Sequence, residues 1–148
     1  MAAILTAAAH ASDLKPVKPK PGDKCPVCGM FVDKYLDFAA GTIHRDGTYA
    51  VFDGAKDLFK YLMNPGAYAP NRRPSDITAV FVTDYYSLAP VDGKLARYVI
   101  GSDVYGPMGR ELIPFAVEKE AKEFLADHRG KRILRFEEVT PEILKGLD

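Results

Sequence analysis

Apolar and polar positions in the first half of the chain predict two strands followed by a helix. Residues 36–45 (LDFAAGTIHR) have the mixed character of a strand, Asp46-Gly47 is a turn signal, and residues 48–52 (TYAVF) form a second strand. Apolar residues then recur at helical spacing and stop before Asn64-Pro65: Ala55, Leu58, Phe59 and Leu62. Asp53 is the expected N-cap of this helix. The pattern predicts a β-β-α unit.

The second half of the chain begins with further strands. Residues 77–85 (ITAVFVTDY) and 97–100 (RYVI) have strong strand composition and are separated by Pro90 and Asp92-Gly93. We expect these two strands to pair with each other. A glycine-rich loop, residues 101–109, leads from them into a short strand at 112–115.

Helical spacing returns after this short strand. One apolar face is formed by Val117, Ala121, Phe124 and Leu125, and the helix is expected to stop at Gly130. A last strand is predicted at residues 132–136, and a short helix lies within residues 140–148, with Thr140 as its cap and Pro141 at its first position.

The two halves of the chain resemble each other in pattern. FDGAKDLFKYL (52–62) and FAVEKEAKEFLADH (115–128) each begin with a strand-ending Phe and continue into a lysine-rich amphipathic helix. A Gly/Met pair precedes each of them, Gly29-Met30 in one half and Met108-Gly109 in the other. A pseudo-repeat would place the two methionine loops in equivalent positions, facing one another.

Composition and charge are those of an ordinary globular domain. The chain has 148 residues, of which 47% are hydrophobic and 27% charged, and its 20 basic and 20 acidic residues cancel. Net charge therefore steers the protein toward neither nucleic acid nor an anionic membrane, and no phosphate-cradling glycine motif is present. No stretch approaches 18 consecutive apolar residues, so no transmembrane helix is expected.

The N-terminal segment has the features of an export signal. Residues 1–11 (MAAILTAAAHA) form a short apolar run that ends in an A-x-A pattern, so we expect a signal peptide that is cut before Ser12. The basic residues that usually begin such a peptide are missing, so we expect its start to be truncated. Residues 12–24 are rich in proline and lysine and are expected to be a solvated tether. Folded structure is then expected from Cys25.

The only two cysteines lie in CPVCGM, residues 25–30, and this spacing has several interpretations. A structural zinc site needs a second ligand pair, which is absent, and haem attachment needs a histidine where Gly29 stands. A thiol-disulfide oxidoreductase using Cys25 and Cys28 remains an alternative, although no strand precedes the motif as that mechanism requires. A structural domain clamped by a Cys25–Cys28 disulfide is a further alternative.

Soft metal binding is the remaining interpretation. Thiolate and thioether sulfurs select Cu(I), so Cys28 and Met30 are candidate ligands. Met108 lies in a glycine- and proline-rich loop that is a poor place for a core residue, and His44 on the predicted hairpin offers an imidazole. Met63 and His128, by contrast, have positions typical of packing.

Several segments together resemble the NosL family of copper-binding accessory proteins. The matching segments are CPVCGMFV, FAAGTIHRDGTYAVFDGAKDLFKYL, VYGPMGRELIPF and GKRILRFEEV, and the resemblance covers residues 25–139. It implies an α+β fold of two related β-β-α-β units. It also implies a Cu(I) chaperone, without enzymatic activity, that works outside the cytoplasmic membrane and delivers copper to nitrous oxide reductase.

The resemblance assigns ligands position by position. Cys28, Met30 and Met108 correspond to the family's sulfur ligands, and Cys25 and His44 are secondary candidates. Expected partners are a copper-accepting enzyme and a copper donor protein or transporter, with no nucleic acid. Many members are lipoproteins anchored through a cysteine directly after the signal peptide, but Ser12 occupies that place here, so we expect a soluble periplasmic protein.

Overall fold

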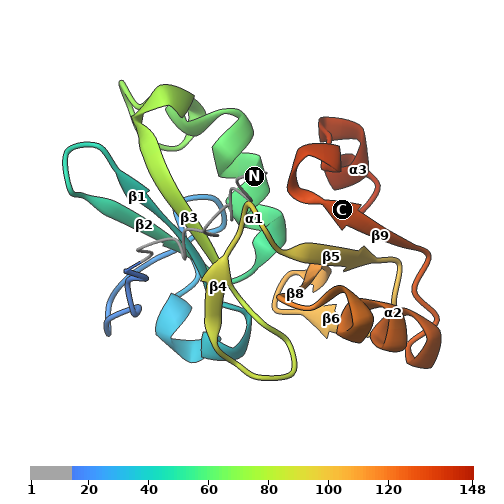
Figure 1. Ribbon diagram of the computed structural model, residues 1–148. Helices are drawn as coiled ribbons and strands as arrows, with labels where there is room; N and C mark the ends of the chain where they lie inside the picture. Colours follow the sequence, from blue (N-terminus) through green and yellow to red (C-terminus); the bar gives the residue numbers. More distant parts are fainter. Residues whose placement is uncertain (1–14) are drawn as a thin grey trace, which may run out of the picture.

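The part of the chain that the computed structural model describes, residues 15–148, contains a four-stranded and a three-stranded antiparallel β-sheet and three α-helices (Figure 1). The first sheet has the strand order β2-β1-β3-β4, with β1 Ala40–His44, β2 Tyr49–Phe52, β3 Ile77–Thr83 and β4 Pro90–Asp92. The second has the order β8-β5-β9, with β5 Arg97–Ile100, β8 Ile113–Phe115 and β9 Arg132–Arg135. A small separate hairpin pairs β6 Tyr105–Gly106 with β7 Gly109–Arg110.

The helices follow the predicted positions. The α-helices are α1 Ala55–Met63, α2 Glu118–Asp127 and α3 Pro141–Lys145. Short 3₁₀ turns occupy Val32–Lys34, Leu36–Phe38, Pro65–Ala67, Pro74–Asp76 and Phe136–Glu138. Thr140 caps α3 as expected, because its Oγ1 accepts a hydrogen bond from the Ile143 N–H at 3.2 Å. The first predicted strand is shorter than expected, since Leu36–Phe38 is a 3₁₀ turn and β1 begins at Ala40.

The chain forms two units of the same topology. In the first, β1, β2, α1 and β3 follow one another and the strands pair in the order β2-β1-β3; in the second, β5, β8, α2 and β9 pair in the order β8-β5-β9. This agrees with the expected α+β fold of related β-β-α-β units. The expected equivalence of the methionine loops is wrong, however, because Met30 precedes β1 whereas Met108 lies between β5 and β8.

The expected pairing of residues 77–85 with residues 97–100 is also wrong. Strand β4 pairs with β3 along the edge of β3 that faces away from β1. The Gly93 N–H extends this pairing by donating to the Val80 carbonyl at 2.9 Å. The chain then turns, and β5 pairs instead with β8 and β9. The pairing preference of each strand is set by its neighbours in space, which strand composition does not reveal.

Ordered contacts begin before Cys25. Val17 packs against the core, the Tyr49 hydroxyl donates to Asp23 Oδ2 at 3.0 Å, and the Val32 N–H donates to the Asp23 carbonyl at 3.0 Å. Part of the predicted tether is therefore held against the first sheet. The predicted signal peptide, residues 1–11, and its cleavage position lie outside the described residues. Within residues 15–148, none of the helices has the length and apolarity needed to cross a membrane.

Helix α1 packs against both sheets. Its buried residues share one hydrophobic cluster with β2 and β3 on one side and with Tyr98 of β5 and Leu134 of β9 on the other. The rings of Phe59 and Tyr98 meet edge to face with their centroids 5.1 Å apart. A second cluster lies under α2: Val99, Ile113, Phe115, Ala121 and Phe124. The position of α1 is therefore fixed by both units.

Asp84, at the end of β3, joins the two units through hydrogen bonds. Its Oδ1 accepts from the N–H groups of Tyr86 and Ser87 at 3.0 and 2.8 Å, and its Oδ2 accepts from the N–H of Ala116, just after β8, at 2.7 Å. Burial opposes ionisation of this carboxyl, but the N–H donors of Ser87, Ala116 and Tyr86 hold the pKa of Asp84 below its usual value.

Replacing Asp84 by asparagine should destabilise the fold. Asp84→Asn places an amide NH₂ against backbone N–H donors, so we expect the free energy of unfolding to fall by about 1–3 kcal/mol at pH 7. Because the pKa of Asp84 is lowered in the folded state, this loss should shrink as the pH falls below about 4. Urea denaturation checks both effects, with Asp92→Asn as the control, because the half-buried Asp92 side chain accepts from a single backbone N–H, that of Lys94; equal losses in the two variants would contradict the assignment.

Candidate metal centre

The CPVCGM segment folds into a tight loop that turns both cysteines the same way. The Gly29 N–H donates to the Cys25 carbonyl at 2.8 Å, and the Cys25 N–H donates to the Met30 carbonyl at 2.9 Å. Gly29 has a φ of +80°, in the left-handed region that glycine tolerates without strain. A β-bridge between Lys24 and Phe31 closes the loop. These backbone contacts bring the two cysteines close together.

Two thiols and two carboxylates meet at the start of α1. Ligand atoms of Cys25, Cys28, Asp53 and Asp57 all lie within 4.8 Å of one another. Cys25 Sγ donates to Asp57 Oδ2 at 3.4 Å, and Cys28 Sγ donates to Asp53 Oδ1 at 3.3 Å. Cys25 and both carboxylates are buried, whereas Cys28 is half-buried. The cluster is a candidate metal centre that reaches the surface through Cys28.

One oxygen of this cluster has no partner. Asp53 Oδ2 is buried without a hydrogen bond among the described residues. Leaving a buried carboxylate oxygen unsatisfied costs free energy, and a bound cation would remove that cost. The orphaned oxygen is therefore an observation, independent of the cysteine spacing, that favours a cation here.

Burial keeps the thiols protonated in the absence of metal. It raises the pKa of Cys25 well above its usual value and that of Cys28 to about 11, and it also raises the pKa of Asp57. Because thiolate is the metal ligand, an ion entering the cluster must displace protons that now bridge sulfur and oxygen. Raised pKa values also disfavour the oxidoreductase interpretation, in which a lowered thiol pKa activates the nucleophile. Both cysteines are free, with no disulfide between them.

A carboxylate from the second unit caps the first turn of α1. The predicted cap, Asp53, is wrong: Gly54 is the N-cap residue and Asp53 turns toward Cys28. Glu111 Oε1 instead accepts from the N–H groups of Lys56 at 2.5 Å and Leu112 at 2.8 Å. A Cβ atom at position 54 would collide with Glu111 Oε2, so glycine is required there. Burial raises the pKa of Glu111 to about 8. The two N–H donors favour the ionised form and lower the pKa, but the effect of burial is larger.

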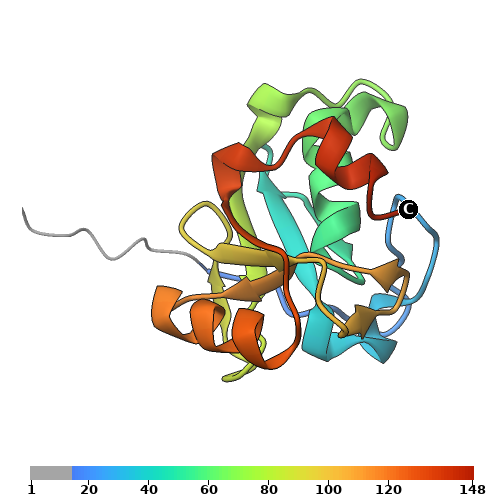
Figure 2. The same cartoon turned by 90° about the vertical axis from the view of Figure 1, so that its right-hand side faces the viewer.

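The same helical turn holds the loop that carries Met108. Lys56 is buried, and its Nζ donates to the Met108 carbonyl at 3.0 Å. The Met108 side chain, in the turn between β6 and β7, is 43% exposed, and Met30 is half-buried. Figure 2 shows the amber β6–β7 hairpin on the same side of the molecule as the blue segment that contains the cysteines. Both sulfur-bearing loops are thus attached to one turn of α1.

His44 has other partners. It is buried at the end of β1, where its Nε2 lies 3.1 Å from the Tyr61 hydroxyl and 3.3 Å from Thr42 Oγ1, and its Nδ1 lies 3.1 Å from Thr48 Oγ1. Burial, followed by the nearby Arg72, lowers the pKa of His44. Both ring nitrogens are occupied, and His44 is not part of the thiol–carboxylate cluster.

Sequence reasoning missed the two carboxylates. Asp53 and Asp57 are four residues apart at a helix start, a spacing that places two side chains on one face. That signal was available, but Asp53 was expected to be the helix cap and no role was expected for Asp57. Their partner cysteines come from a distant loop, which spacing does not reveal.

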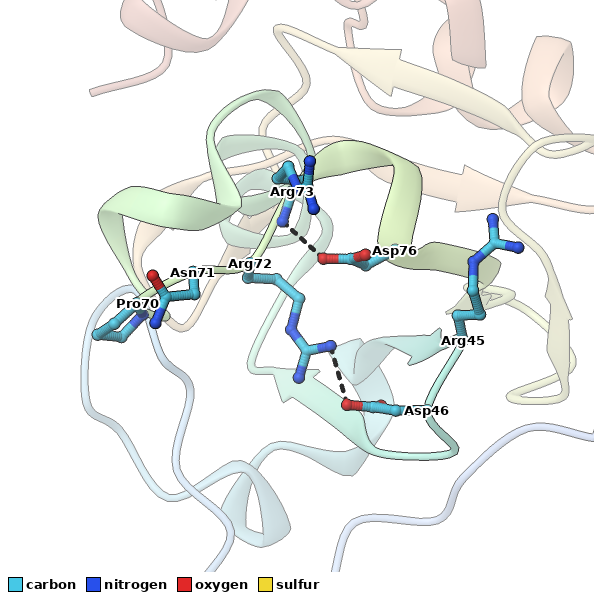
Figure 3. A pocket seen from close by; sticks show the side chains of 7 residues that line it. All are labelled: Arg45, Asp46, Pro70, Asn71, Arg72, Arg73 and Asp76. Carbon is cyan, nitrogen blue, oxygen red and sulfur yellow. Dashed lines mark hydrogen bonds and ion pairs between the residues drawn. The ribbon is translucent and has the colours of Figure 1, made fainter.

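One surface hollow lies apart from the thiol–carboxylate cluster. It has a volume of about 450 Å³ and is formed by the tip of the β1–β2 hairpin and residues 70–76 (Figure 3). No cysteine or methionine lines it, and its charges are partly paired: Arg72 Nη1 lies 3.3 Å from Asp46 Oδ2, and the Arg73 N–H donates to Asp76. We assign no metal chemistry to this hollow.

The donor set determines which ions the cluster suits. Thiolate and thioether sulfurs favour Cu(I), whereas two thiolates with two carboxylate oxygens also suit Zn(II). Hard cations such as Mg²⁺ and Ca²⁺ prefer all-oxygen sites and are disfavoured by the sulfurs. The donor set of this candidate centre therefore suits a soft or borderline metal ion.

Comparisons with known proteins point to one family. The NosL family model matches residues 16–144. A relative named copper-binding lipoprotein NosL, from Stutzerimonas stutzeri, is 32% identical in an alignment of 140 residues that covers 89% of this chain and 70% of that protein.

Solved structures agree with this match. The crystal structure of the copper chaperone NosL from Shewanella denitrificans superposes with a TM-score of 0.70 at 25% identity, covering 86% of this chain and 97% of that one. The solution structure of apo-NosL from Achromobacter cycloclastes, with a TM-score of 0.52 at 21% identity, covers 71% and 87% and shows the likeness of fold alone.

The raised thiol pKa values can be measured directly. In the reduced, metal-free Cys25→Ser variant, the rate at which iodoacetamide alkylates Cys28 should rise by about tenfold per pH unit between pH 7 and 9.5 without a plateau. The physical reason is that only the thiolate reacts. A plateau below pH 8 would mean a lowered pKa and would favour the oxidoreductase interpretation.

Glu111 should make stability depend on pH. Its pKa in the folded state is about 8, above the 4.5 of an ordinary glutamate. Its contribution to the free energy of unfolding is therefore complete below about pH 4.5 and is lost as the pH rises through 8, by up to about 1.4 kcal/mol per pH unit. Glu111→Gln keeps an acceptor for both N–H groups and should remove this slope.

Urea denaturation of the reduced, metal-free protein at pH 5, 6, 7 and 8 measures the effect. Glu118→Gln, at the exposed start of α2, is the matched control and should retain the slope of the parent protein. If the difference in free energy of unfolding between Glu111→Gln and the parent protein is the same at every pH, the raised pKa of Glu111 is contradicted.

Proposed function

This chain belongs to the NosL family, a family of copper-binding accessory proteins, and on that premise we propose that it is an exported Cu(I) chaperone. The protein binds metal and performs no enzymatic turnover, as the names of its relatives indicate. We further propose that the ion is Cu(I), because four candidate donors on the two loops are sulfur atoms: Cys25, Cys28, Met30 and Met108.

The proposal rests on one observation above all, the attachment of both sulfur-bearing loops to the first turn of α1. Asp53 and Asp57 accept hydrogen bonds from the thiols, and Lys56 holds the Met108 carbonyl. We take Cys28, Met30 and Met108 as the primary ligands and Cys25 as the fourth sulfur. The two carboxylates balance the charge of the ion. His44 is left out of this set because hydroxyl groups occupy both of its nitrogens.

A gradient of exposure across these sulfurs suits transfer of the ion. Cys25 is 1% exposed, Cys28 is half-buried and Met108 is 43% exposed. An acceptor protein can therefore approach the ion from the Met108 side and replace the outer ligands one at a time, while the buried thiol is released last. Weak thioether ligands keep the barrier to such an exchange small.

The family resemblance supports the identity of the partners and the place of work. We propose that the chain receives copper from a donor protein or transporter in the periplasm and delivers it for assembly of the copper centres of nitrous oxide reductase. Delivery would depend on a protein interface around the sulfur loops, and no nucleic acid is involved.

Removing a sulfur ligand should weaken Cu(I) binding without unfolding the domain. Met108→Leu keeps the side-chain volume and Cys28→Ser keeps the size, so each should lower Cu(I) affinity by at least about tenfold, or about 1.4 kcal/mol, with little change in stability. Anaerobic competition of the reduced protein with a chromogenic Cu(I) chelator measures the affinity.

Met63→Leu is the matched control, because Met63 ends α1 and packs against the core. It should retain the affinity of the parent protein. Full affinity in both Met108→Leu and Cys28→Ser would show that the ion binds elsewhere.

A further inference from the structure

A second polar hollow lies behind the hairpin that carries Met108. Its volume is about 200 Å³, and it is lined by Gly101, Ser102, Tyr105, Arg110, Glu111 and Lys131. The turn after β5, the β6–β7 hairpin and the residue before β9 form its walls. None of the four residues of the thiol–carboxylate cluster lines it. It is therefore a separate feature of the second unit.

Two cations face this hollow without a counter-ion. Within residues 15–148, the side chains of Arg110 and Lys131 form no ion pair and no hydrogen bond, although other lysines and arginines of the fold do. The Tyr105 hydroxyl adds a further hydrogen-bond donor, whereas the Ser102 hydroxyl donates to the Val104 carbonyl at 3.4 Å. The lining thus offers donors and positive charge from three separate segments.

The one acid in the lining does not neutralise these cations. Glu111 uses Oε1 to accept from the N–H groups of Lys56 and Leu112, and burial raises its pKa to about 8. The raised pKa reduces the negative charge that Glu111 carries near neutral pH. With two cations and one acid in its lining, the hollow consequently carries a net positive charge.

Backbone contacts position the segments that carry the lining residues, and the side chains of Arg110 and Lys131 are exposed. Tyr105 and Arg110 are direct partners across the β6–β7 hairpin, and the Lys131 N–H donates to the Ile100 carbonyl at 2.9 Å. The Ser102 hydroxyl accepts from the Val104 N–H at 3.3 Å, which holds it at the turn. The donors therefore surround one space that a group of several heavy atoms can enter.

We propose that this hollow binds an oxyanion, a phosphate-like ion or a carboxylate, between Arg110 and Lys131. Guanidinium and ammonium groups bind such oxygens through charge-assisted hydrogen bonds, which are stronger than neutral ones. The oxyanion comes either from solution or from an acidic side chain of a docked protein, since the hollow adjoins the hairpin of Met108. The proposal is independent of copper binding.

Titration of the reduced, metal-free full chain with inorganic phosphate at constant ionic strength tests this site. The backbone amide signals of residues 101–111 in ¹H–¹⁵N spectra should shift and saturate with a Kd in roughly the millimolar range. Arg110→Ala and Lys131→Ala should each raise that Kd by at least about fivefold. Arg132→Ala removes the same charge from the neighbouring residue on β9, outside the hollow, and should leave the Kd unchanged.

A parallel titration with N-acetylglutamate amide separates the two sources. Tighter binding of phosphate assigns the site to a free oxyanion, and equal or tighter binding of the carboxylate assigns it to an acidic side chain of a partner. Shifts that do not saturate, or that are the same in Arg110→Ala, Lys131→Ala and Arg132→Ala, would overturn the proposal.

Discussion

The position of the first turn of α1 is the constraint on which the candidate metal centre depends. No local side chain caps this turn; Glu111, 55 residues along the chain from Lys56, supplies the acceptor. Residues of the same turn contact the two sulfur-bearing loops, with Asp53 and Asp57 at the thiols and Lys56 at the Met108 carbonyl. The cap thus links the folding of the second unit to the assembly of a cluster in the first.

Charge is the second feature that shapes this centre. A buried cation, Lys56, and the buried carboxyls of Asp53, Asp57 and Glu111 lie around one helix start, where unpaired charges would be costly. Protons on the thiols limit the negative charge while the site holds no metal, and an entering ion replaces those protons. The sulfur donors of the centre suit a soft cation, and this agrees with the Cu(I) that we propose.

The sequence predicted the local features well because their signals are local. The tight CPVCGM loop, the helices and the cap of α3 depend on residues close together in the chain. The pairing of β5, the role of Glu111 and the hydroxyl partners of His44 depend on contacts between distant segments, and composition does not encode them. Asp53 shows the difference most clearly. Its position suits a helix cap, but its Oδ1 accepts a hydrogen bond from the thiol of Cys28 instead.

X-ray absorption spectroscopy of the Cu(I)-loaded protein tests the central claim most directly, because it counts the sulfur neighbours of the ion. The account predicts a first shell dominated by sulfur, which loses one sulfur in Met108→Leu and is unchanged in Met63→Leu. A shell dominated by nitrogen or oxygen, or one that Met108→Leu leaves intact, would contradict convergence of the two loops on one ion.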